Sequence, residues 1–83
     1  MKTFFYEIRE ELGLSLEEMA LLAGVSIYTI YSLEAGNLAK INANVKDLLI
    51  RLGYDTEVIE ETYHYERQQK AEQLFKDRII KKS

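Results

Sequence analysis

Fourteen carboxylates are the side chains of this chain best suited to acid–base chemistry, and several stand next to one another. They include three adjacent pairs: Glu10/Glu11, Glu17/Glu18 and Glu60/Glu61. Two carboxylates can act as general acid and general base only when both reach the same substrate. Neighbouring residues of a helix point about 100° apart, so these pairs do not converge. We interpret them as solvated helix faces.

Other groups that could bind a metal or attack a substrate are sparse. His64 stands between two tyrosines without a second histidine at helical spacing, and the chain has no cysteine. Histidine and cysteine are the ligands that structural zinc sites use. No glycine-rich phosphate loop or nucleophile motif occurs in the sequence. We therefore expect no enzyme activity, no catalytic residue, no metal and no cofactor.

The sequence predicts that the secondary-structure elements of this chain are helices. Glycine just past a helix end is common, because it adopts the left-handed conformation without steric cost. The chain has four glycines and no proline: Gly13, Gly24, Gly36 and Gly53 each follow a stretch with helical periodicity. Start signals stand between them, since Ser15 and Glu18 form a capping-box pattern, Ser26 precedes the next run, and Asn44 precedes VKDLLIRL.

The apolar residues recur at intervals of three and four, and no period-two strand pattern is present, which predicts an all-α fold. From Asp55 onward no glycine or proline interrupts the chain, so residues 56–81 can form one helix of about 40 Å. We expect one compact domain at residues 1–54 and a C-terminal helical extension at residues 55–83.

Size and charge limit the functional classes. The 83 residues are 47% hydrophobic, enough for one small domain, and no run approaches the length of a membrane span. We expect a cytoplasmic protein without a membrane partner. The net charge is −3, whereas residues 67–83 hold six basic and two acidic side chains. These tail cations could reach a DNA backbone.

A helix-turn-helix layout occupies residues 16–36, in the run LEEMALLAGVSIYTIYSLEAG. Ala20 is small where two helices would meet, and Gly24 permits the turn. The sequence resembles the Cro/C1-type helix-turn-helix proteins of the XRE family over about residues 4–54. The resemblance rests on LGLSLEEMA, the AGVS turn, TIYSLEAG and the closing LLIRLGY. It implies a lambda-repressor-like bundle of about five helices, and an ion pair between Arg9 and Glu34.

The resemblance also implies a DNA-binding transcriptional regulator. The positions that match the family's base-reading residues are Ile27, Tyr28 and Ser32, with Ser26 and Tyr31 at the margins. Phosphate contacts are expected from Asn37, Lys40, Asn42, Asn44 and Lys46. The chain departs from the family pattern at Leu16 and Ala35, where a phosphate-holding glutamine and asparagine are common. None of the base-facing side chains offers the bidentate bonds of arginine or glutamine, so readout would rely on shape, hydroxyls and apolar contact.

Two partners besides DNA follow from the apolar residues. The C-terminal extension carries Leu74, Phe75, Ile79 and Ile80, which we expect to pair with a second copy in a homodimer, since operators of this class are usually near-palindromic. Ile27, Tyr28 and Tyr31 could cover the core, or they could form an exposed surface. An exposed surface without lysine or arginine also fits an alternative function, a protein-interaction module that modulates another regulator or acts as an antitoxin-like partner.

Overall fold

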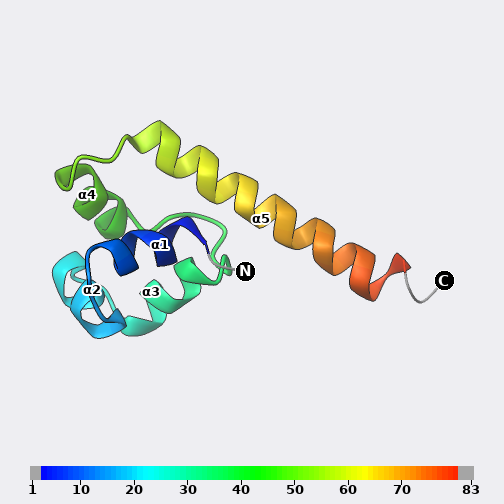
Figure 1. Ribbon diagram of the computed structural model, residues 1–83, viewed down its shortest axis with the longest axis horizontal. Helices are drawn as coiled ribbons and strands as arrows, with labels where there is room; N and C mark the ends of the chain where they lie inside the picture. The colour runs from blue at the N-terminus through cyan, green and yellow to red at the C-terminus, as the bar shows by residue number, and fades with distance from the viewer. Residues whose placement is uncertain (1–2, 81–83) are drawn as a thin grey trace.

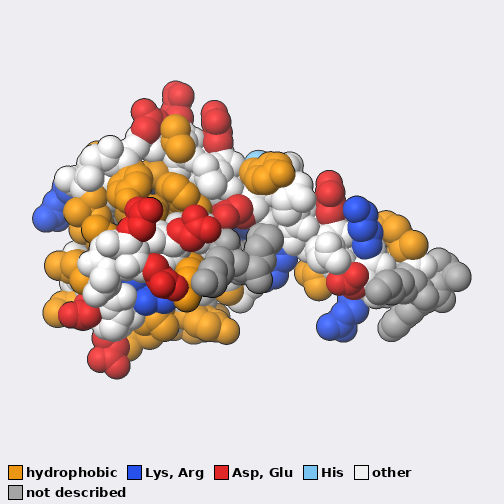
Figure 2. Space-filling model, in the orientation of Figure 1, with side chains coloured by type: hydrophobic (Ala, Val, Ile, Leu, Met, Phe, Trp, Pro, Cys, Tyr) orange, Lys and Arg blue, Asp and Glu red, His pale blue; other side chains and the backbone are white. Residues whose placement is uncertain are grey.

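The computed structural model describes residues 3–80, which form a helical head and one long projecting helix (Figure 1). The elements are α1 (Phe4–Glu11), α2 (Leu16–Ala23), α3 (Ile27–Glu34), α4 (Ala43–Arg51) and α5 (Thr56–Arg78). No strand occurs in residues 3–80, and the all-α prediction is confirmed. The molecule measures 47 × 25 × 20 Å, because α5 extends past the other helices as a narrow arm (Figure 2).

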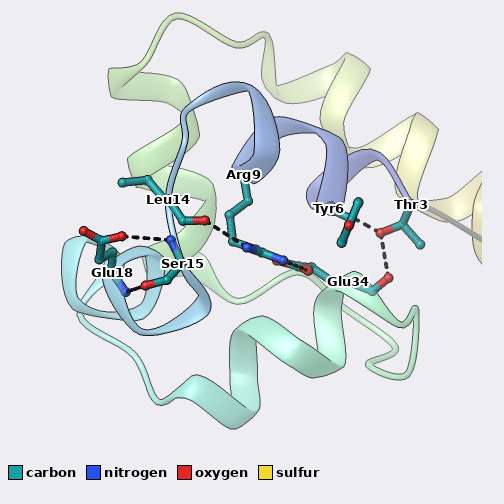
Figure 3. A network of polar contacts seen from close by, with 7 residues as sticks. All are labelled: Thr3, Tyr6, Arg9, Leu14, Ser15, Glu18 and Glu34. Atoms are coloured by element: carbon teal, nitrogen blue, oxygen red, sulfur yellow. Dashed lines mark hydrogen bonds and ion pairs between the residues drawn. The ribbon is translucent and has the colours of Figure 1, made fainter.

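Side-chain caps start the helices, mostly where the sequence predicts them. The capping box of α2 is confirmed: the Glu18 N–H donates to Ser15 Oγ over 3.1 Å, and the Ser15 N–H donates to Glu18 Oε1 over 2.9 Å (Figure 3). The prediction that Asn44 caps the fourth helix is wrong. Asn42 is the cap, and its Oδ1 accepts the N–H of Asn44 over 2.8 Å. An asparagine two residues earlier thus bonds to the N–H groups of the second and third residues of the helix.

Gly24 ends α2 and sets the direction of α3. Its φ is +71°, in the left-handed region, and the Val25 N–H donates to the Ala20 carbonyl over 3.0 Å. This closed turn allows α2 and α3 to meet at 110°. Gly13, Gly36 and Gly53 also have positive φ at the ends of their helices, as the spacing of the four glycines predicts.

The core lies between α1, α2, α3 and α4 and continues into α5. Met19, Leu33 and Leu49 are buried in it. Ile59 of α5 has no exposed surface, and the Tyr63 ring packs edge-on against a phenylalanine of α1. The helical bundle therefore extends past residue 54, because its fifth helix is the first part of α5. We call residues 3–63 the head and residues 71–80 the distal end of α5.

An ion pair fixes α1 to the end of α3, as the family resemblance implies. Arg9 Nε donates to Glu34 Oε2 over 2.6 Å, and Arg9 Nη2 donates to Glu34 Oε1 over 3.1 Å (Figure 3). A third bond joins Arg9 Nη1 to the Leu14 carbonyl over 2.8 Å. Only 14% and 10% of the two side chains are exposed. The bond to Glu34 raises the pKa of Arg9, and the predicted pair is confirmed.

Candidate nucleic-acid interface

The outer side of α3 presents three large side chains to solvent. Tyr28 is 73% exposed, Tyr31 57% and Ile27 45%. Residues three and four positions apart share a helix face, so these three side chains form one surface. Ile30 and Leu33 occupy the opposite, buried side of α3. The alternative that the three side chains cover the core is therefore wrong.

Ser32 does not belong to this surface. We expected Ser32 to face a DNA base, but it is 1% exposed. Its carbonyl accepts the Asn37 N–H over 2.8 Å, which folds the chain after α3 back towards it. A side chain with one hydroxyl beyond Cβ is too short to emerge from this position. The expectation that Ser32 reads a base is therefore wrong in this structure.

Four of the other expected contact residues already have partners within the chain, among them Asn37, whose Oδ1 accepts a bond from Lys70 Nζ over 2.6 Å. Ser26 Oγ caps α3 by accepting the Thr29 N–H over 3.2 Å. Asn42 caps α4, and Lys46 Nζ donates to Glu60 Oε1 over 2.6 Å. By contrast, Lys40 and Asn44 are exposed. Lys40 and Lys46 line a hollow beside α5, so these two cations do not join the surface formed by Ile27, Tyr28 and Tyr31.

The short helices α2 and α3 cross at 110° around a glycine turn, and α3 is exposed along one side. This arrangement is the geometry of a helix-turn-helix. A family model described as helix-turn-helix matches residues 5–58. The chain belongs to the Cro/C1-type helix-turn-helix family. This family consists of DNA-binding regulators rather than enzymes. No individual curated protein and no solved structure matches the chain.

The helices α2 and α3 carry acidic but no basic side chains. No lysine or arginine occurs between residues 10 and 39, and Glu17 and Glu18 are exposed in the first turn of α2. Two further apolar side chains are exposed on α2: Leu21, which is 82% exposed, and Leu22. Sequence reasoning missed both leucines, although their positions beside the buried Met19, Ala20 and Ala23 place them on the other face of the helix.

Two cations of α5 contact the head of the protein. Arg67 Nη1 donates to the Gly36 carbonyl over 2.7 Å, and Lys70 Nζ donates to the Ala35 carbonyl over 2.8 Å. In this structure these two tail cations bond to the head, and a contact of either one with a DNA backbone stays a prediction. Lys76 and Arg78 are exposed. The remaining tail cations, Lys81 and Lys82, lie outside the described residues.

The distal end of α5 carries the four residues expected to pair two copies. Leu74, Phe75, Ile79 and Ile80 are all exposed. Phe75 and Ile79 lie four residues apart and share one helix face with Ala71. Leu74 instead lines a cavity of about 480 Å³ against Thr3 and Ala35 of the head. The four residues thus do not form a single stripe.

Within residues 3–80, no group of three or more histidine or acidic side chains is placed to hold a metal ion. No single helix in this range has the length and apolar character to cross a membrane. The helices α2 and α3 reach that composition only when taken together, bent by 110°.

Proposed function

We propose that this helix-turn-helix protein regulates transcription by binding an operator as a homodimer, with α3 in the major groove. The observation that carries the proposal is the exposure of Ile27, Tyr28 and Tyr31 on the helix that this motif presents to DNA. Ile27 can contact a thymine methyl group, and a tyrosine hydroxyl can donate to a phosphate. Recognition of this kind depends on groove shape and apolar contact.

The proposal includes a weak dependence of binding on salt. Each phosphate neutralised by a cation contributes about −0.9 to the log–log slope of affinity against salt concentration. Arg9, Lys46, Arg67 and Lys70 are all bonded within the chain. Backbone amides and neutral side chains must therefore supply much of the phosphate contact, and we expect a slope shallower than that of a strongly basic regulator.

The homodimer is proposed to form through the distal end of α5. Every residue from 71 to 80 is exposed, and an apolar stripe of Ala71, Phe75 and Ile79 has no covering element within the described residues. A second copy offers the same stripe, and a two-fold pair of this kind matches a near-palindromic operator.

Selection of duplexes from a random pool tests DNA binding. The recovered duplex is then measured by fluorescence anisotropy against Tyr28→Ala, with Tyr65→Ala as the control, because Tyr65 is an exposed tyrosine on α5. We expect Tyr28→Ala to bind about tenfold more weakly and Tyr65→Ala to bind like the unmodified protein. Failure to enrich any duplex, or equal affinity of all three proteins, contradicts the proposal.

Analytical ultracentrifugation tests the dimer with two adjacent substitutions. Phe75→Ser removes part of the apolar stripe, while Lys76→Ser makes the same new side chain one position away. We expect a dimer for the unmodified chain and for Lys76→Ser, and a shift towards monomer for Phe75→Ser. A monomer in all three samples rejects the dimer.

The second candidate function is protein binding at the same surface. It is favoured by the absence of lysine and arginine between residues 10 and 39 and by the exposed Leu21 beside Glu17. The partner would be another regulator or a toxin encoded beside this gene. This candidate predicts that Tyr28→Ala weakens binding of the purified neighbour while Tyr65→Ala does not, and that no duplex is enriched.

A further inference from the structure

Four consecutive residues after α3 are each bound by a side chain of α5. The bonds run from Lys70 Nζ to the Ala35 carbonyl (2.8 Å), from Arg67 Nη1 to the Gly36 carbonyl (2.7 Å), from Lys70 Nζ to Asn37 Oδ1 (2.6 Å) and from the Tyr63 hydroxyl to the Leu38 carbonyl (2.7 Å). We call residues 35–38 the post-α3 loop. The long helix therefore holds every residue of this loop.

These bonds complete the C-terminus of α3. The N–H groups of Gly36 and Asn37 return to the carbonyls of Leu33 and Ser32, over 3.1 and 2.8 Å. This Schellman arrangement leaves the last carbonyls of the helix without partners. Thr3 Oγ1 donates to the Glu34 carbonyl over 2.6 Å, and Lys70 Nζ donates to the Ala35 carbonyl.

The cations also act on the helix dipole. The C-terminus of a helix carries partial negative charge and favours a nearby cation. No basic residue lies in the last turn of α3. Arg67 and Lys70 supply the missing charges from α5.

The core packing of α5 sets the position of these cations. Ile59 and Tyr63 are buried, and Arg67 and Lys70 follow on the same side at helical spacing. A Cβ at Gly36 would lie 3.9 Å from the side chains of both cations, so the loop passes close to α5. Rigid packing of the helix therefore fixes the loop.

The bond to Lys70 also orients the Asn37 side chain. A lysine ammonium has only donors, so it must face the amide oxygen of Asn37. The amide nitrogen is then the part of this exposed side chain that remains to donate a bond. An amide N–H₂ is a suitable donor to a DNA phosphate.

We propose that Lys70 and Arg67 are positioning residues, which hold the post-α3 loop so that the Asn37 amide nitrogen faces a DNA phosphate. The inference rests on the proposed DNA binding and adds that α5 controls one of its contacts. Neither cation touches the phosphate in this arrangement. Their effect on affinity passes through Asn37.

The test compares Lys70→Gln with Lys76→Gln, which removes the same charge from an exposed position on the same helix. Fluorescence anisotropy measures binding of the duplex recovered by selection. Hydrogen exchange of the Asn37 backbone N–H is measured in the free proteins. We expect Lys70→Gln to bind about fivefold to tenfold more weakly and its Asn37 amide to exchange faster. Lys76→Gln should change neither quantity beyond a small electrostatic effect, and Lys70→Arg should retain most of the affinity.

A double-substitution cycle and the salt slope separate positioning from direct contact. In an Asn37→Ala background, Lys70→Gln should have little further effect on affinity, because both changes remove one contact. The salt slope should stay constant in Lys70→Gln. A slope reduced by about one unit would show that Lys70 itself neutralises a phosphate, which overturns the inference. Equal affinities of Lys70→Gln and Lys76→Gln overturn it as well, whereas an unmodified protein that binds no duplex rejects the proposed function itself.

Discussion

The two ends of α5 have the same secondary structure but different surroundings. Its first turns belong to the head, where Ile59 is fully buried and Tyr63 bonds to the post-α3 loop. At the distal end every side chain from residue 71 to 80 is exposed. One helix thus contributes both to the core and to an uncovered surface, and only the first role stabilises the isolated chain.

Local interactions maintain the helix where the core does not. Ala71, Glu72, Gln73 and Leu74 are good helix formers. Gln73 donates to Asp77 over 3.0 Å, and Lys76 and Arg78 lie in the last turn, where cations favour the helix dipole. Substitutions at the distal end should therefore have little effect on the stability of the head. The difference between the two ends of α5 can be tested by matched substitutions at each end.

The largest effect is expected inside the head, from the ion pair of Arg9 and Glu34, whose side chains are only 14% and 10% exposed. Arg9→Ala leaves the Glu34 carboxylate with little solvent and without its cation, and loss of one partner of such a pair costs about 3–5 kcal/mol of unfolding free energy. Chemical denaturation measures the loss, and thermal melting should show a fall of several degrees or more.

Lys46→Ala is the control for the ion pair. It removes the pair with Glu60, whose side chains are 29% and 53% exposed, and exposed pairs contribute at most about 1 kcal/mol. Similar losses for Arg9→Ala and Lys46→Ala would mean that burial does not distinguish the two pairs.

The second prediction compares the loss of stability when isoleucine is replaced by alanine near each end of α5. Ile59→Ala opens a cavity in the core and should lower the unfolding free energy by about 2–5 kcal/mol. Ile79→Ala, at the exposed end, should change it by no more than about 0.5 kcal/mol when the protein is dilute enough to be monomeric. Urea denaturation of both variants checks this, and a comparable loss for Ile79→Ala would contradict an uncovered distal end.

The smallest effect concerns Glu66, which lies between the two ends. Its Oε2 accepts the Phe4 N–H over 2.8 Å, while its buried Oε1 has no hydrogen-bond partner among the described residues. Burial raises the pKa of Glu66, the Phe4 bond opposes this shift, and nearby Glu7 adds to it. A raised pKa stabilises the fold below the ordinary carboxyl pKa, and this contribution is lost as the pH rises through the raised value.

Denaturation at two pH values measures the effect of Glu66. Relative to Glu66→Gln, the unmodified protein should be more stable at pH 4.5 than at pH 7. Glu72→Gln, on an exposed part of the same helix, separates the effect of burial from that of removing one charge. A difference between the unmodified protein and Glu66→Gln that is equal at both pH values would contradict the prediction.

The sequence predicts those features that depend on neighbouring residues. Gly24 and the Ser15 capping box mark helix ends through bonds spanning a few positions, and both are confirmed. The Arg9–Glu34 pair spans 25 positions, and it was predicted from the family resemblance rather than from neighbouring residues. Residues of the exposed α3 surface follow from helical periodicity.

Features that depend on the packing of distant elements could not be predicted in the same way. Ser32 is 1% exposed, whereas its match to a base-reading position of the family favoured exposure. The bonds of Arg67 and Lys70 join residues 31 and 35 positions apart, so a basic tail could be interpreted as a DNA contact instead. The cap at Asn42 was missed because two asparagines compete within three residues.

The unbroken course of α5 has a consequence for target spacing. Residues 56–78 contain no glycine or proline, and a helix of this length extends about 35 Å without a flexible joint. Two heads joined at the distal ends would keep one separation and one mutual rotation. Insertion of about five base pairs between the half-sites would turn the second site to the opposite side of the duplex, where a rigidly connected pair reaches only one of them.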